Sequence, residues 1–153
     1  MGRFVNSGNS AFQVALNSEI YVDKTGLLAY TNKVMDTTAK FICNSRPRRF
    51  GKSITADMLT AYYCKGCSSE EMFSSLEIGQ APDFTKYLNQ YDVIKINMQE
   101  FLSMSESVED MLNILQMRLI KDLKSAYPEV VSSDRLIFAM QDVFAETKCQ
   151  FVI

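Results

Sequence analysis

The chain has 153 residues, of which 47% are apolar, 11% aromatic and 22% charged, and its formal net charge is −2. This composition is typical of a globular domain. It excludes disordered and fibrous proteins, and no apolar run approaches the roughly 18 residues of a membrane-spanning helix. The absence of histidine excludes Ser-His-Asp triads, Cys-His dyads and His-ligated zinc, so any chemistry must use lysine, arginine, carboxylate, hydroxyl or thiol groups or a bound metal.

The first 37 residues are predicted to be a largely polar N-terminal extension. Residues 1–20 have scattered apolar positions, which favours loop with a short helix near 10–16. The segment Tyr21-Val22-Asp23-Lys24-Thr25 then leads into a second short helix, with Asp23 or Thr25 as a possible cap. We expect residues 1–37 and 38–153 to be the extension and the core of one domain.

Residues 38–153 alternate between strand-like and helix-like patterns. The expected elements are a strand at 39–43, a loop at 44–51, a helix at 52–63, helical pieces at 70–76 and 84–88, a strand at 92–98, a helix from Ser107 to Pro128, a helix capped by Ser133 and a strand at 150–153. Strands that alternate with helices predict an α/β layer fold with a parallel sheet of about three core strands.

Positive charge is concentrated in one short window. Between Asp36 and Asp57 there is no acidic residue, whereas the same window contains five basic residues: Lys40, Arg46, Arg48, Arg49 and Lys52. In a chain that is acidic overall, such a cluster indicates a local anion site rather than a broad nucleic-acid surface, although a solvated basic loop would give the same pattern.

The basic window includes the end of a phosphate-binding loop pattern, Gly51-Lys52-Ser53, between the first strand and its helix. Gly51 allows a tight turn, backbone amides at the helix start face an anion, and Lys52 would reach the phosphates. The Ser53 hydroxyl would ligate Mg²⁺ in the ATP complex. The expected phosphate-binding residues are Arg46, Pro47, Arg48, Arg49, Phe50, Gly51, Lys52, Ser53 and Ile54.

The segments Tyr21–Thr25 and Ser45-Arg46-Pro47-Arg48-Arg49-Phe50-Gly51-Lys52-Ser53 resemble those of the AAA-ATPase-like family of bacteria and archaea. Residues 72–78 and 91–97 are weaker matches, and the resemblance covers about residues 10–153. It implies a three-layer P-loop NTPase core in which an arginine at the first-glycine position, here Arg46, is usual. It also implies that fuller members continue into a PD-(D/E)XK nuclease-like domain.

The same resemblance implies a Walker B strand that ends in acidic residues. Residues 151–153 match the strand but no acids follow them in this sequence, so we expect the N-terminal part of an ATPase that binds nucleotide without hydrolysing it. Hydrolysis would then belong to the full-length parent.

Three residues before the loop are further candidates for nucleotide contact. Asp23 and Lys24 could approach the nucleotide, or could form an ion pair and a helix cap. Tyr21 could lie against the adenine ring. Glu100 could approach the site from the end of its strand, although a surface acid at a helix start is the simpler interpretation.

Two alternatives concern other kinds of site. The basic loop could bind nucleic acid or an acidic partner instead of nucleotide. Cys64 and Cys67 have the spacing of a zinc or redox pair, but a helix C-terminus capped by Gly66 explains the same residues. Free thiols suit a reducing compartment, so we expect a cytoplasmic protein.

Overall fold

The structure is a computed structural model of the chain, and it describes residues 2–45, 47 and 49–153. The chain divides into two compact units. Unit 1 combines Met1–Ser7 with Tyr91–Ile153, and unit 2 is Gly8–Gln90. Each unit has its own buried apolar core.

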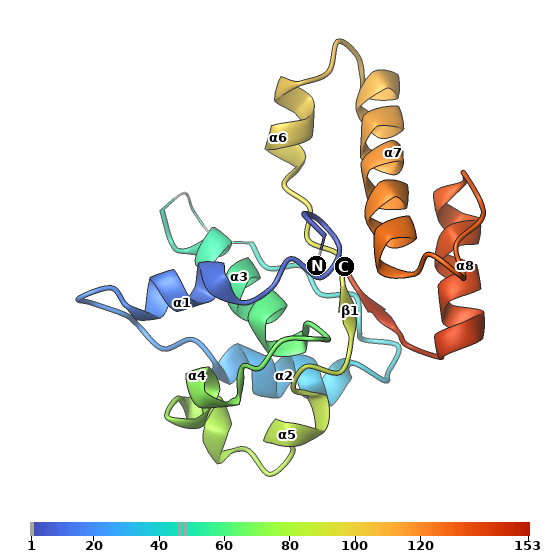
Figure 1. Cartoon of the computed structure of the whole chain (residues 1–153). Coiled ribbons are helices and arrows are strands. Elements are labelled where there is room, and N and C mark those ends of the chain that lie inside the picture. The colour runs from blue at the N-terminus through green and yellow to red at the C-terminus, as the bar shows by residue number, and fades with distance from the viewer. Residues whose placement is uncertain (1, 46, 48) are drawn as a thin grey trace. The chain divides into compact units, whose positions relative to one another are not determined.

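Unit 2 contains the loop and helix that the sequence singles out. Its regular elements are α1 (Ser10–Leu16), α2 (Gly26–Val34), α3 (Lys52–Tyr63), α4 (Glu70–Ser74), the 3-10 helix η1 (Glu77–Gln80) and α5 (Phe84–Tyr87). Five of these were expected from the sequence, and α3 has the predicted bounds. Figure 1 labels the five α-helices of this unit.

Aromatic side chains form the core of unit 2. The rings of Phe12 from α1 and Phe73 from α4 stack with centroids 5.1 Å apart, and Tyr62 from α3 meets Phe73 edge-on at 5.3 Å. All three side chains are almost completely buried. Large aromatic rings bury much apolar surface, which lets such short helices form a stable core.

A buried polar network joins α2 to α3. The Tyr63 hydroxyl donates to Asn32 Oδ1 at 2.7 Å, and Asn32 Nδ2 donates to the Tyr62 hydroxyl at 3.1 Å. The Tyr62 hydroxyl in turn donates to the Phe84 carbonyl at 2.7 Å. Among the described residues, no buried side-chain nitrogen or oxygen atom is without a hydrogen-bond partner, so this network holds α2 on α3 with its polar groups satisfied.

Unit 1 has three helices and a small sheet. Its elements are β1 (Asp92–Val93), α6 (Met98–Ser103), α7 (Val108–Ala126), α8 (Leu136–Thr147) and β2 (Phe151–Val152). The two strands are parallel, with Asp92 opposite Phe151 and Val93 opposite Val152. Helix α7 packs against both α6 and α8 (Figure 1). The parallel pairing agrees with the expectation of an α/β fold.

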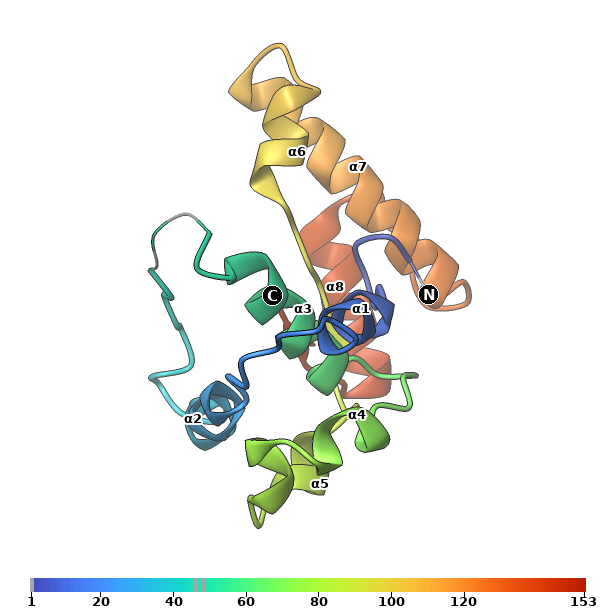
Figure 2. The same ribbon diagram turned by 90° about the vertical axis from the view of Figure 1, so that its left-hand side faces the viewer.

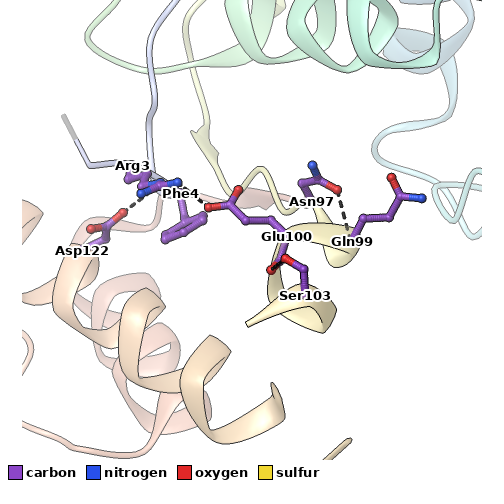
Figure 3. A network of polar contacts seen from close by, with 7 residues as sticks. All are labelled: Arg3, Phe4, Asn97, Gln99, Glu100, Ser103 and Asp122. Carbon is purple, nitrogen blue, oxygen red and sulfur yellow. Dashed lines mark hydrogen bonds and ion pairs between the residues drawn. The ribbon is translucent and has the colours of Figure 1, made fainter. Parts of the chain in front are cut away.

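Polar contacts hold residues 3–5 against the helices of unit 1, the unit to which they belong (Figure 3). One Asp122 carboxylate oxygen accepts hydrogen bonds from the amides of Phe4 at 2.7 Å and Val5 at 3.2 Å. Arg3 forms an ion pair with Glu100 of α6. Glu100, considered above as an approach to the nucleotide, is therefore engaged within unit 1.

Several predicted elements differ from the observed ones. Residues 40–45 form no strand, and Phe41 is 87% exposed, because no neighbouring strand supplies the ladder hydrogen bonds that a strand requires (Figure 2). The sheet thus has two strands among the described residues instead of about three. The strand expected at 92–98 ends early because Asn97 caps α6. Ser107 caps α7 as predicted, but α8 begins three residues after Ser133.

Among the described residues, no helix has both the length and the apolar character needed to cross a membrane.

Candidate functional site

The candidate site begins where the basic loop turns into α3. Gly51 has the left-handed conformation, with φ +75°, and α3 starts at the next residue. The Thr55 amide and hydroxyl both donate to the Gly51 carbonyl, at 2.9 and 3.0 Å, which closes the first turn. The N-cap residue, Gly51, has no side chain that could accept from the first amide groups of the helix. The amides at a helix N-terminus point out of the helix end, which is the arrangement that an anion site requires.

Lys52 and Ser53 occupy the first two positions of α3. The Lys52 side chain folds back over the loop, and its Nζ donates to the Pro47 carbonyl at 3.1 Å. Ser53 is exposed next to it. Lys52, the lysine that would contact phosphate, thus donates to a loop carbonyl. A bound anion would have to take the place of this carbonyl as the hydrogen-bond acceptor of Lys52.

A second lysine reaches the same turn from the segment between α1 and α2. Lys24 Nζ donates to the Phe50 carbonyl at 3.2 Å. It also lies so close to Gly51 that a Cβ atom built on this glycine would be 2.8 Å from the ammonium nitrogen. The positive φ of Gly51 favours glycine at this position, and a Cβ atom there would displace the end of the Lys24 side chain.

Asp23 is directed away from the loop. Its carboxylate accepts hydrogen bonds from the Thr25 amide at 2.8 Å, the Thr25 hydroxyl at 2.7 Å and the Glu77 amide at 2.8 Å. Burial alone would raise the pKa of Asp23, but these three hydrogen bonds outweigh it and hold the pKa below its ordinary value. Asp23 thus fixes the turn before α2, and it forms no ion pair with Lys24.

Thr25 is the N-cap residue of α2, as one of the two expected caps, but its side chain makes no capping hydrogen bond. Its hydroxyl oxygen instead accepts from the Ile78 amide of η1 at 3.1 Å, and the residue is fully buried. The backbone on either side of Lys24 is therefore anchored to η1.

A cavity of about 340 Å³ lies beside the turn, within unit 2. Its walls are residues of the α1–α2 connection and of the loop and α3, namely Ala15, Ser18, Ile20, Tyr21, Val22, Lys24, Arg49, Phe50, Gly51, Ile54, Thr55 and Met58. The Tyr21 ring meets Phe12 edge-on at 5.9 Å, which holds it at the wall. Burial, followed by the nearby Asp23 charge, raises the pKa of Tyr21, so its hydroxyl stays neutral at physiological pH.

The cavity brings together only part of the predicted site. Tyr21, Lys24 and the segment Arg49–Gly51 with Ile54 line it, whereas Asp23 does not. Arg46 and Arg48 lie outside the described residues. The sequence interpretation missed the apolar wall, Ile20, Val22 and Met58, because such residues carry no chemical signature. Their proximity to Tyr21 or to the start of α3 was the one available signal.

The Cys64–Cys67 pair matches the helix-end interpretation. Cys64 follows the last residue of α3, and Gly66 has φ +82°. Burial, then the neighbouring Cys64 thiol, raises the pKa of Cys67 to about 12, so it is not a thiolate at neutral pH. No three His, Cys, Asp or Glu side chains gather as a metal site in the part of the chain that the structure describes.

The arrangement combines three features. Helix amides face outward at the start of α3, the side chains of Lys24, Arg49 and Lys52 add positive charge, and a cavity with apolar walls adjoins them. This combination suits a ligand with an anionic tail and a flat, weakly polar ring system.

Comparison with known proteins gives one match. A family model described as "Predicted AAA-ATPase" matches residues 8–153. No curated protein and no solved structure matches the chain.

Proposed function

Because the chain belongs to the AAA-ATPase-like family, we propose that it binds ATP through the loop from Arg46 to Ile54. The observation that carries this proposal is the left-handed Gly51 directly before α3, whose first residues are Lys52 and Ser53. The positive end of the helix dipole and outward-facing amides favour a polyphosphate at this place.

The phosphates would be bound by the amides of residues 52–54 and by the Lys52 ammonium group. Pro47 has no amide hydrogen, so the arginines of the loop would supply donors that the backbone lacks there. Lys52 would exchange the Pro47 carbonyl, 3.1 Å away, for a charged phosphate oxygen, which is the stronger acceptor.

The adenine ring would occupy the cavity beside the loop. Its volume of about 340 Å³ and its apolar walls suit a nucleobase, and Tyr21 offers a ring at the wall. Ile20, Val22 and Met58 would contact the base without selecting a particular one, because aliphatic side chains offer no directed hydrogen bonds.

Mg²⁺ fits this site only together with the nucleotide. It prefers oxygen ligands and retains several waters, so one serine hydroxyl and phosphate oxygens are a sufficient donor set. Ser53 would be the protein ligand. The ion would neutralise phosphate charge, and the chain's own residues would orient the nucleotide.

We also propose that residues 39–43 can form a strand of a three-layer P-loop core. The segment Phe41-Ile42-Cys43 has the apolar, β-prone composition of a buried strand. Binding is all that we propose for this chain.

The test is calorimetric titration of the chain with ATP and Mg²⁺, using wild type, Lys52→Ala and the control Lys33→Ala. Lys33 is an exposed lysine in the last turn of α2. We expect Lys52→Ala to weaken ATP binding by roughly tenfold or more and Lys33→Ala to leave it unchanged. Equal affinities of wild type and Lys52→Ala would reject the proposal.

The alternative, a nucleic-acid surface, has one observation in its favour. Phe50 is 58% exposed next to Arg49, and an exposed ring beside a guanidinium group can stack on a base. Titration with single-stranded oligonucleotide at increasing salt separates the two functions. Steeply salt-dependent oligonucleotide binding without ATP binding would support the alternative.

A further inference from the structure

Lys24 lies outside the phosphate-binding loop, yet its ammonium group ends at that loop. Its Nζ is 3.2 Å from the Phe50 carbonyl and would be 2.8 Å from a Cβ atom built on Gly51, the residue directly before α3. Lys24 and Lys52 therefore bind two carbonyls of one loop, Phe50 and Pro47, from different parts of the chain.

The charge of Lys24 is not balanced by a neighbouring acid. Asp23, the adjacent carboxylate, accepts from Thr25 and Glu77 instead. Within the described residues, Lys24 is held by a carbonyl dipole alone. A hydrogen bond from an ammonium group to a charged phosphate oxygen is stronger than one to a neutral carbonyl, so exchanging the carbonyl for a phosphate stabilises the complex.

The position of Lys24 is fixed before any ligand binds. The Leu27 amide donates to the Lys24 carbonyl at 3.1 Å, and the buried Thr25 ties the next residue to η1. The side chain extends from this anchored backbone along the cavity wall. Such preorganisation lowers the entropy cost of a contact with ligand.

We propose that Lys24 is a second ammonium ligand of the triphosphate, supplied from the segment before the loop. This inference rests on the proposed function and deepens it, because it assigns Lys24 to the phosphates rather than to the base. Tyr21, three residues earlier, would serve the base from the same segment.

The test compares ATP with inorganic tripolyphosphate, which has the phosphates but no base. Affinities are measured for wild type, Lys24→Met, Tyr21→Ala, Lys52→Ala and the exposed-lysine control Lys33→Met. We expect Lys24→Met to weaken the binding of both ligands by roughly tenfold, because one charge-assisted hydrogen bond is lost. Tyr21→Ala should weaken the binding of ATP but not of tripolyphosphate, and Lys33→Met should weaken the binding of neither ligand.

The outcomes separate the two proposals. If wild type binds ATP and Lys52→Ala weakens it, but Lys24→Met behaves like Lys33→Met, only the role of Lys24 is overturned. A Lys24→Met loss confined to ATP also overturns it, because the lysine would then act on the base. If wild type binds neither ligand, the proposed function fails and this inference fails with it. Thermal unfolding checks that each variant is folded, and Lys24→Gln replaces Lys24→Met if the latter is not.

Discussion

Asn89 is predicted to be the most sensitive polar residue of unit 2, because it holds the C-terminal end of α3. Its Nδ2 lies 2.9 Å from the Cys64 carbonyl and 3.1 Å from the Ala61 carbonyl, and its Oδ1 accepts from the Ser69 amide at 3.1 Å. Asn89→Ala removes these three hydrogen bonds, each worth roughly 1 kcal/mol net, together with longer contacts of Nδ2 to the Tyr62 carbonyl at 3.3 Å and the Ser69 hydroxyl at 3.4 Å. The residue has φ +56°, where alanine costs about 1 kcal/mol more. The expected loss is about 3–4 kcal/mol.

The assay is urea unfolding followed by far-UV circular dichroism, with two comparison variants. Asn89→Gly loses the same hydrogen bonds but suits the positive φ, so it should be about 1 kcal/mol more stable than Asn89→Ala. Asn113→Ala, an exposed asparagine on α7, should change the free energy of unfolding by less than about 0.5 kcal/mol. If Asn89→Ala costs no more than Asn113→Ala, Asn89 does not anchor α3 and the reasoning is refuted.

Two further predictions concern the turn before α3 and the segment that leads to Lys24. Gly51→Ala and Gly66→Ala should each cost about 1–2 kcal/mol of stability, since both glycines have positive φ. Only Gly51→Ala should also weaken ATP binding, because its Cβ would displace Lys24 whereas that of Gly66 meets open space; equal affinity losses in a titration would contradict this. The lowered pKa of Asp23 means that the native state favours its carboxylate, so its stabilising effect is present above the ordinary pKa of about 4 and is lost as the pH falls through the lowered value. The melting temperature of wild type should therefore exceed that of Asp23→Asn at pH 7, and the difference should shrink below pH ~4; a constant difference would show that the carboxylate charge is not what the turn requires.

The helices were predictable where a short-range signal specifies them. The apolar spacing of residues 52–63 and the Gly-Lys-Ser sequence before it located α3, and the Ser107 side chain, which accepts from the Asp110 amide at 3.1 Å, located the start of α7. These signals act within one or two turns, so the residues that determine them are close together in the sequence.

Strands were less predictable because they depend on distant partners. Residues 39–43 have the composition of a strand, yet β-propensity reflects packing against neighbouring strands, and none adjoins them in the described residues. In contrast, Asp92–Val93 and Phe151–Val152 pair across nearly sixty residues. No local sequence pattern predicts this pairing. The cavity wall was missed for the same reason, since Val22 and Met58 meet only after α1 and α3 pack together.

The segment Tyr21–Thr25 shows how a short sequence can combine anchoring and binding groups. Its residues face different surroundings: Asp23 and Thr25 bond to η1, whereas Tyr21, Val22 and Lys24 line the cavity beside Gly51. Replacing an anchor should therefore disturb ligand binding indirectly, through the position of Lys24, while replacing Lys24 should disturb it directly and leave the turn intact. For this reason all of Tyr21–Thr25 is expected to contribute to ligand binding, although only some of its side chains line the cavity.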